Sequence, residues 1–190
     1  MRKMFFFVLA SAALSLMVPA QNAQAQSETP KVEVGAHYTR LSLRDFGTTD
    51  HGVGARITLN VTDSFAVEGE VNFFPRGRDN LAAPTGFSGV SQRRQGLFGV
   101  KYGMRSERAG VFGKIRPGFM HFGENSLQFP FSPSIPTTTE FALDIGGVFE
   151  IYPARSVAFR FDVGDAIIRF GGLGFTSHNL QITTGVAMRF

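Results

Sequence analysis

Apolar and polar residues alternate along most of the chain. In the stretch VAFRFDVG, residues 157–164, the charged residues Arg160 and Asp162 alternate with the apolar residues Val157, Phe159, Phe161 and Val163. Side chains of a β-strand point alternately to its two faces, so the apolar residues share one face and the charged residues share the other. The pattern predicts a strand with one apolar and one polar face. It does not say which face meets water.

Eight segments carry this alternation, and none repeats apolar residues at helical spacing. The predicted strands are residues 31–39, 52–61, 65–73, 97–104, 111–119, 140–151, 157–170 and 180–190. Segments of about ten residues are long enough to cross a bilayer when the strand is tilted.

The predicted connections alternate in length. Three are short, at residues 62–64, 105–108 and 153–156. Four are longer, at residues 44–50, 75–94, 123–137 and 171–177. In an up-and-down meander, this order puts all the tight turns and both termini at one end. Transmembrane barrels have the same asymmetry, with short periplasmic turns and longer outer loops.

The charged residues fall on the minority face of the segments, and their two signs nearly balance. Inside a narrow closed barrel such balance is required, because an unpaired buried charge costs several kcal/mol. We therefore predict that one set of residues forms a charge network in the lumen. This set is Glu33, Arg56, Glu68, Glu70, Lys101, Lys114, Arg116, Glu140, Asp144, Glu150, Arg160, Asp162 and Arg189.

A soluble barrel of the lipocalin type would have the opposite polarity, with the apolar face inside. The alternation alone fits both arrangements. Three features favour an apolar face that meets lipid: the last residue is an apolar-face Phe190, the connections are sorted by length, and about forty apolar-face side chains exceed what an eight-stranded lumen can hold. The predicted fold is all-β: an eight-stranded antiparallel up-and-down transmembrane β-barrel.

Aromatic residues are expected at both rims of the membrane-facing band. Those predicted near the periplasmic rim are Phe65, Tyr102, Phe149, Tyr152 and Phe190, and those near the outer rim are Tyr38, Phe73, Phe119 and Phe141. Pro117 lacks an N–H group for a ladder, so we expect a bulge or a strand end there.

The N-terminus predicts a cleaved signal peptide at residues 1–25, followed by a barrel domain at residues 26–190. Arg2 and Lys3 precede an apolar stretch at residues 4–20, and Ala23 and Ala25 are small residues suited to the cleavage positions. An uncleaved anchor helix is one alternative, although the apolar run is short for a membrane span, and cleavage after Ala20 is another. The protein is therefore expected to be exported.

Composition narrows the chemistry. The chain has 0 Cys, which excludes disulfides and zinc sites with Cys ligands. Its net charge of +4 includes two residues of the predicted signal, and the remaining charge is too small to indicate nucleic-acid binding. The four His show no metal-ligand spacing, so neither a metal nor a cofactor is expected.

With these features, the chain resembles the eight-stranded outer-membrane barrels of the outer-membrane protein A and X type. The resemblance rests on strand number, sorted loops and the final stretch TTGVAMRF, residues 183–190. It implies an outer-membrane location in a Gram-negative-type bacterium. It also implies a lumen plugged by charges, to which Glu68, Lys101, Lys114, Arg116, Glu140 and Arg160 are candidates, and an assembly signal at Val186, Met188 and Phe190 that the barrel-assembly machinery reads.

The leading functional prediction is a non-enzymatic, monomeric barrel with a structural or surface-interaction role through its loops. Long loops are commonly functional or disordered. Arg76, Arg78, Arg93 and Arg94 are candidates for contacts with lipopolysaccharide phosphates, or they are ordinary solvated loop charges. The stretch FPFSP, residues 129–133, is either an adhesive tip or a segment folded over the barrel mouth.

Two alternatives remain open. A small lipid-modifying enzyme would need an activated nucleophile beside a base, for which the candidate bases are His37, His51, His121 and His178. Ser177 and His178 are expected in a loop, and no His-x-Ser pair lies on a predicted lipid-facing strand. A narrow pore or small-ligand carrier is the second alternative, although eight strands leave little room in the lumen.

Overall fold

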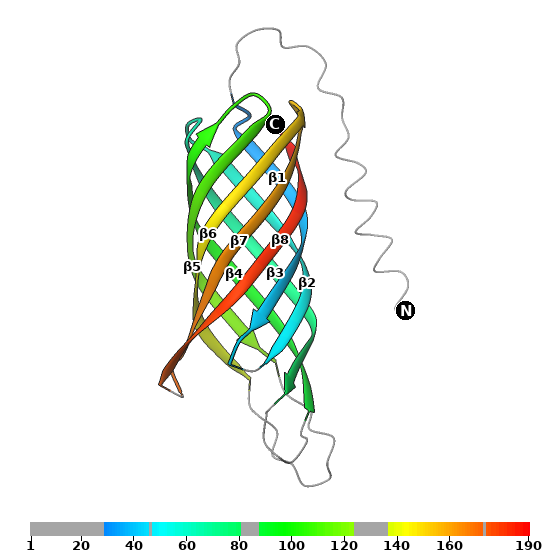
Figure 1. Cartoon of the computed structure of the whole chain (residues 1–190), viewed down its shortest axis with the longest axis vertical. Helices are drawn as coiled ribbons and strands as arrows, with labels where there is room; N and C mark the ends of the chain where they lie inside the picture. The colour runs from blue at the N-terminus through cyan, green and yellow to red at the C-terminus, as the bar shows by residue number, and fades with distance from the viewer. Residues whose placement is uncertain (1–28, 46, 81–87, 124–136, 173) are drawn as a thin grey trace, which may run out of the picture.

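The computed structural model describes residues 29–45, 47–80, 88–123, 137–172 and 174–190, without the side chains of residues 76–80 and 88–91. These residues form eight antiparallel strands that close into a single barrel (Figure 1). The predicted fold class is therefore confirmed. The strands are β1 (Val32–Leu43), β2 (Thr48–Asn60), β3 (Phe65–Asn80), β4 (Ser88–Arg105), β5 (Ala109–Phe122), β6 (Thr138–Ala154), β7 (Val157–Phe170) and β8 (Phe175–Arg189).

Pairing between β1 and β8 closes the barrel. The ladder runs from Glu33 opposite Arg189 to Ser42 opposite Leu180. At its end, the Phe190 N–H donates to the Val32 carbonyl at 2.8 Å. Closure gives strands on both sides of every strand, which is the arrangement that a sheet needs in hydrocarbon, where no water can satisfy backbone groups. Among the described residues, none forms a helix long and apolar enough to span a membrane.

The connections are sorted between the two ends of the barrel. Residues 61–64, 106–108 and 155–156 join β2 to β3, β4 to β5 and β6 to β7 at the end that also holds the start of β1 and the C-terminus (Figure 1). We call this the tight-turn end. The strand ends joined by the other four connections lie at the opposite end, which we call the loop end.

The outward face is apolar and the inward face carries the charges. In β7, Phe159 and Phe161 are 54% and 46% exposed, whereas Arg160 and Asp162 are 7% and 0% exposed. The same contrast holds along the other strands, where the exposed large hydrophobic residues include Val34, Val53, Ile57, Leu59, Val71, Phe98, Ile115, Ile145 and Val186. The inverted polarity follows the sequence period as expected for a lipid-facing barrel.

The strands extend further toward the loop end than the predicted length of about ten residues. They contain between 12 and 18 residues. Residues 48–50 belong to β2 and residues 175–177 belong to β8, so the predicted connections at 44–50 and 171–177 are too long. These segments are rich in Thr, Ser and Asp, which are common in turns, so the sequence alone predicted loops there. The turns themselves contain Gly47 and Gly174, whose φ angles are 59° and 70°.

Pro117 causes neither of the two expected disturbances. It lies inside β5, and the β4–β5 register is the same on both sides of it. The ladder lacks only the two pairs between Leu97–Gly118 and Val100–Ile115, whereas pairing with β6 continues through Pro117 opposite Leu143. Because proline has no N–H, pairing is lost locally on the β4 side without a bulge.

One aromatic prediction is wrong. Tyr152 does not face outward at the periplasmic rim, since its side chain lies inside the barrel and is 5% exposed. The period of two continues through this part of β6, so Tyr152 shares the inward face with Glu150 while Ile151 between them faces outward, and the assignment of Tyr152 to the rim departed from that period. The other predicted rim aromatics face outward: Tyr38, Phe65, Phe73, Tyr102, Phe119, Phe141, Phe149 and Phe190.

Glycines at inward positions allow neighbouring strands to approach closely, and this gives a matched test. A Cβ atom on inward Gly99 would lie 2.1 Å from the Ile115 carbonyl oxygen, whereas one on outward Gly113 would have its nearest neighbour at 3.9 Å. We expect Gly99→Ala to lower the free energy of unfolding by about 1–3 kcal/mol through overpacking, and Gly113→Ala to leave it nearly unchanged. Urea titration of both variants in lipid vesicles would measure this, and equal unfolding midpoints would contradict it.

Candidate functional site: the filled interior of the barrel

The inward side chains change in character from the tight-turn end to the loop end. Along β3 they are Glu68, Glu70, Asn72 and Phe74 in that order. The strands therefore build three layers, which we call the charged layer, the amide layer and the apolar cap. Each layer has contributions from strands on opposite sides of the barrel, so the wall positions one continuous filling.

Arg160 in β7 is a centre of the charged layer. Its Nη2 donates to Glu68 Oε2 at 2.9 Å, and its Nε donates to Asp162 Oδ1 at 2.6 Å. Its Nη1 lies 3.3 Å from Glu150 Oε1. A buried guanidinium surrounded by carboxylates has its donors satisfied, which offsets part of the cost of removing the charge from water.

Arg116 and Arg56 connect the same acids from other strands. Arg116 Nη1 donates to Glu70 Oε2 at 2.6 Å, and its Nε donates to Asp144 Oδ2 at 3.0 Å. Arg56 Nε donates to Glu70 Oε2 at 2.7 Å, and its Nη2 donates to Asp162 Oδ2 at 3.0 Å. Glu70 and Asp162 are thus shared between cations, which joins the pairs into one network across the lumen.

A second group of polar side chains lies nearer the tight-turn end. The Tyr152 hydroxyl donates to Glu150 Oε2 at 2.6 Å and accepts from Arg105 Nε at 3.0 Å. Arg189 Nε donates to Glu33 Oε1 at 3.2 Å, and its guanidinium lies 4.1 Å from the centroid of the Tyr152 ring. This group closes the charged layer toward the periplasmic rim expected for transmembrane barrels.

The structure brings together twelve of the thirteen residues predicted for the charge network. The buried members are Glu33, Arg56, Glu68, Glu70, Lys101, Lys114, Arg116, Asp144, Glu150, Arg160, Asp162 and Arg189. Lys101 pairs with Glu150, and Lys114 Nζ lies 2.8 Å from Asp144 Oδ2. Glu140 is half-buried at the loop end, where its Oε2 accepts from the Gly171 N–H at 2.9 Å.

Uncharged amide and hydroxyl groups form the amide layer. Asn72 Nδ2 donates to Gln95 Oε1 at 2.8 Å, and the Gln95 and Gln181 amides lie 3.2 Å apart. His37 Nε2 lies 2.6 Å from Asn72 Oδ1. Asn72 Nδ2 also donates to Glu70 Oε1 at 2.7 Å, and this hydrogen bond connects the amide layer to the charged layer. Hydrogen bonds therefore continue from the charges to the neutral groups without a break.

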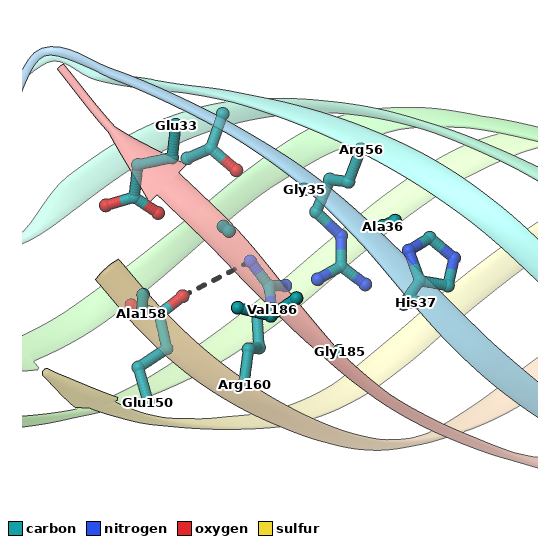
Figure 2. A pocket seen from close by; sticks show the side chains of 12 residues that line it. Glu33, Gly35, Ala36, His37, Arg56, Glu150, Ala158, Arg160, Gly185 and Val186 are labelled. Atoms are coloured by element: carbon teal, nitrogen blue, oxygen red, sulfur yellow. Dashed lines mark hydrogen bonds and ion pairs between the residues drawn. The ribbon is translucent and has the colours of Figure 1, made fainter. Parts of the chain in front are cut away.

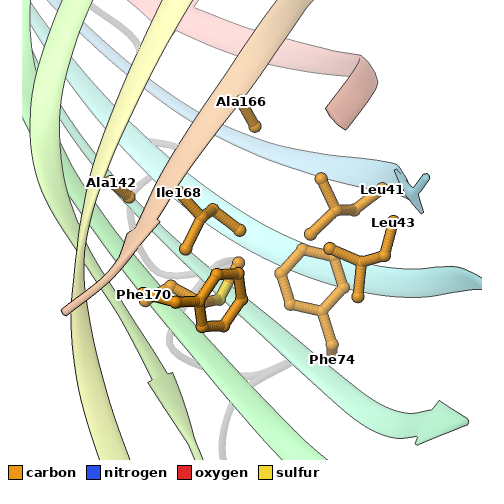
Figure 3. Packing of buried hydrophobic residues seen from close by; sticks show 8 residues of the cluster. Leu41, Leu43, Phe74, Ala142, Ala166, Ile168 and Phe170 are labelled. Carbon is orange, nitrogen blue, oxygen red and sulfur yellow. The ribbon is translucent and has the colours of Figure 1, made fainter. Parts of the chain in front are cut away.

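The apolar cap fills the interior at the loop end (Figure 3). Its members are Leu41, Leu43, Phe74, Met120, Ala142, Ala166, Ile168 and Phe170, with Phe122 packed against them. Inward apolar side chains in this part of the barrel were not predicted. In β1 the alternation continues there with its polarity exchanged, since Leu41 and Leu43 point inward while Arg40 and Ser42 point outward. In β3, by contrast, Phe73 and Phe74 make both faces apolar. The inward side of these positions was not assigned because the predicted strands ended before them.

A buried ion pair lies beside the apolar cap. Arg93 in β4 pairs with Asp50 in β2, both side chains are fully buried, and the guanidinium lies 5.4 Å from the Phe122 ring centroid. The prediction that Arg93 contacts lipopolysaccharide is wrong, because its side chain points into the barrel. Arg93 and Asp50 were assigned to loops, and the longer strands place both on the inward face.

The other three predicted lipopolysaccharide contacts have different positions. Arg94 lies on the outward face of β4 and is exposed near the loop end. Arg76 and Arg78 lie in β3, but their side chains are outside the described residues, as is the predicted adhesive stretch at residues 129–133.

The filling leaves little internal space. One small cavity of about 20 Å³ is lined by the described side chains, among them Glu33, His37, Arg56, Glu150 and Arg160 (Figure 2). A polar cavity of this volume has room for about one water molecule. Figure 2 shows Arg160 and Glu150 pointing toward one another beside it.

The four His are distributed over both faces. His37 points inward, and His51, His121 and His178 lie on the outward face near the loop end. His178 belongs to β8 rather than to a loop, and its Nδ1 lies 2.6 Å from Asp165 Oδ2. Within the described part of the chain, no group of three or more His, Cys, Asp or Glu residues could hold a metal ion.

The predicted assembly signal lies at the tight-turn end of β8. Val186, Met188 and Phe190 are 44%, 37% and 57% exposed and share the outward face. These positions make the three side chains accessible from outside the barrel wall. Their reading by an assembly machinery stays a prediction.

This architecture, an eight-stranded barrel with an apolar outside and a filled polar inside, is that of small transmembrane barrels. Residues 10–190 match the family described as outer membrane protein beta-barrel domain, and the chain belongs to that family. The recognition made from the sequence is thus confirmed at this level. The predicted signal peptide lies outside the described residues.

Solved structures support the fold. Ail of Yersinia pestis, in complex with the heparin analogue sucrose octasulfate, matches with a TM-score of 0.54 and 14% identity over 84% of this chain and 96% of that chain. OprG of Pseudomonas aeruginosa matches with a TM-score of 0.52 and 14% identity over 87% of this chain and 96% of that chain. At such identity the likeness concerns the fold alone. No curated protein sequence matches this chain.

The charge network makes a prediction about stability. Arg160→Leu would leave Glu68, Glu150 and Asp162 with fewer buried partners. We expect it to lower the free energy of unfolding by about 3–5 kcal/mol, the usual cost of breaking a buried pair. Arg155→Leu, in the exposed turn between β6 and β7, is the matched control and should change it little. Urea titration of folded protein in vesicles decides, and equal midpoints for both variants would count against the network.

Proposed function

We propose that the protein is a non-enzymatic integral outer-membrane barrel whose lumen is closed to ions, and which acts structurally or through its outer loops. The carrying observation is the continuous filling of the lumen. Charged, amide and apolar layers succeed one another, and the cavity among the charges is about 20 Å³. In this arrangement the tight-turn end faces the periplasm and the loop end faces outward, as in other transmembrane barrels.

Two different barriers support closure. Ions entering from the periplasmic side would have to separate buried pairs such as Arg160 with Glu68 and Arg116 with Glu70, which already satisfy one another. Ions entering from the outside would have to cross the apolar cap, which offers Leu41, Phe74 and Ile168 in place of water.

The lipid-modifying enzyme is the less well supported alternative. His178 and Asp165 form an exposed hydrogen-bonded pair on the outward face. The nearby hydroxyl groups of Ser42 and Thr49 are hydrogen-bonded to each other at 3.2 Å. A base and an orienting acid without a bonded nucleophile are an incomplete catalytic arrangement. Incubation of the folded protein with lipid A, followed by mass analysis of the acyl chains, would detect the activity.

A planar-bilayer recording tests the closed lumen. Protein refolded in detergent, checked for heat-modifiable migration on a gel, is expected to show no steady single-channel conductance after insertion. Outward Phe161→Ala should behave identically, because it leaves the filling intact. Steady conductance steps from a folded monomer would contradict a closed lumen and would favour the narrow-pore alternative.

A further inference from the structure

The outward face of the wall formed by β7, β8, β1 and β2 contains two hollows, one nearer the tight-turn end and one at the loop end. The first is a shallow, wide-open groove of about 520 Å³ whose outward lining residues are Ala36, Tyr38, Val53, Phe159 and Val186. Its floor is low at Ala36, whose outward side chain is a single methyl group. No Asp, Glu, Lys or Arg lines this lipid-facing groove.

The second hollow is also about 520 Å³. Most of its lining residues are polar, although Leu43 and Leu180 also line it. Ser42 and Thr49 contribute hydroxyl groups, and Arg44, Asp165 and His178 contribute charged or imidazole groups. The hollow begins where pairing of β1 with β8 ends at Ser42 opposite Leu180. Beneath it the wall is closed, because the Arg44 N–H donates to Asn179 Oδ1 at 3.1 Å.

Arg40 and His51 lie between the two hollows. They are directly opposite one another in the β1–β2 ladder, and both are exposed on the outward face. The Tyr38 hydroxyl is hydrogen-bonded to His51 Nδ1, and the two rings stack with their centroids 5.9 Å apart. When the hydroxyl donates to Nδ1, His51 carries its proton on Nε2 and has a donor available to a ligand.

The position of this pair along the barrel suits an anionic headgroup. Toward the tight-turn end, the outward residues of β1 and β2 are apolar, and they include Val34, Ala36 and Ile57. Arg40 and His51 are therefore at the boundary of the apolar band. An arginine there can bind a phosphate by two parallel hydrogen bonds, and its side chain reaches toward the membrane interface.

We propose that this wall binds one phosphorylated glycolipid of the outer leaflet. An acyl chain occupies the apolar groove, the phosphate lies against Arg40 and His51, and the sugar occupies the polar hollow. The apolar, anionic and hydroxyl-rich parts of such a lipid follow one another in the same order as the three parts of the wall. The proposal rests on the proposed outer-membrane location. It assigns the phosphate contact to outward residues in place of Arg93, which is buried.

Binding of bisphosphorylated lipid A to the refolded full chain in detergent, followed by native mass spectrometry, tests the proposal. We expect one bound lipid per barrel and about a tenfold loss of affinity in the double variant Arg40→Gln, His51→Gln. The control Lys31→Gln, Arg155→Gln removes two cations at the tight-turn end and should bind normally. Equal affinity of the two double variants would overturn the proposal.

Two further arms separate the parts of the site. Lipid A without phosphates should bind about tenfold more weakly to the unchanged chain, and phosphatidylglycerol should also bind more weakly because it lacks the sugar. Ala36→Phe fills the apolar groove and should weaken binding, whereas outward Ile115→Phe on the far wall should not. Equal binding of all three lipids would contradict a specific site.

Failure of this proposal is distinguishable from failure of the proposed function. Each variant is first checked for heat-modifiable migration, which reports a folded barrel. A folded barrel that does not prefer phosphorylated glycolipid removes only the lipid site, whereas a chain that never folds in detergent or vesicles removes the outer-membrane barrel itself.

Discussion

Charge compensation inside a closed barrel is the constraint on which the rest of the structure depends. A sheet in hydrocarbon must close on itself, because backbone groups at a free edge would have no partner. Closure with an apolar outside directs the charged residues of the alternating membrane-facing part inward, where water is scarce. Arg56, Arg116 and Arg160 are tolerated there because Glu68, Glu70 and Asp162 reach them from other strands. The pairs hold opposite sides of the wall together, since breaking one leaves a buried charge without its partner.

The layered filling gives the two ends of the barrel different properties. The charged layer ends at the amides of Asn72, Gln95 and Gln181, and the apolar cap begins beyond them. Ion pairs therefore dominate the filling toward the tight-turn end, and apolar packing around the buried pair Arg93–Asp50 dominates it toward the loop end. The outward face changes at a comparable place, where Tyr38 gives way to Arg40. A barrel that is sealed inside leaves its wall and its outer loops as the surfaces for interaction, which is why the proposed lipid site lies on the outward face.

The period of two was sufficient to predict the strand number, the inward set and the order of short and long connections. Those features depend on local alternation, which can be recognised in a single sequence. Three other features were missed. Part of the apolar cap lies beyond the predicted strand ends, where Leu41 points inward while Arg40 points outward, so the polarity of the two faces is exchanged relative to the membrane-spanning part. Arg93 and Asp50 looked like loop charges because the strands continue beyond the membrane-spanning length. Tyr152 was placed at the outer wall as an aromatic residue, although its position two residues after the inward Glu150 already puts it inside. The pairing of individual charges depends on the barrel's stagger, which no single segment contains.

Depth-dependent quenching of single tryptophans tests the inverted polarity most directly, because the chain contains 0 Trp. Phe161→Trp places the indole on the outward face, and Phe74→Trp places it in the apolar cap. In vesicles of lipid brominated on the acyl chains, the account predicts strong quenching at position 161 and little at position 74. Quenching at position 74 with protection at position 161 would show that the apolar face is internal, and it would contradict the account.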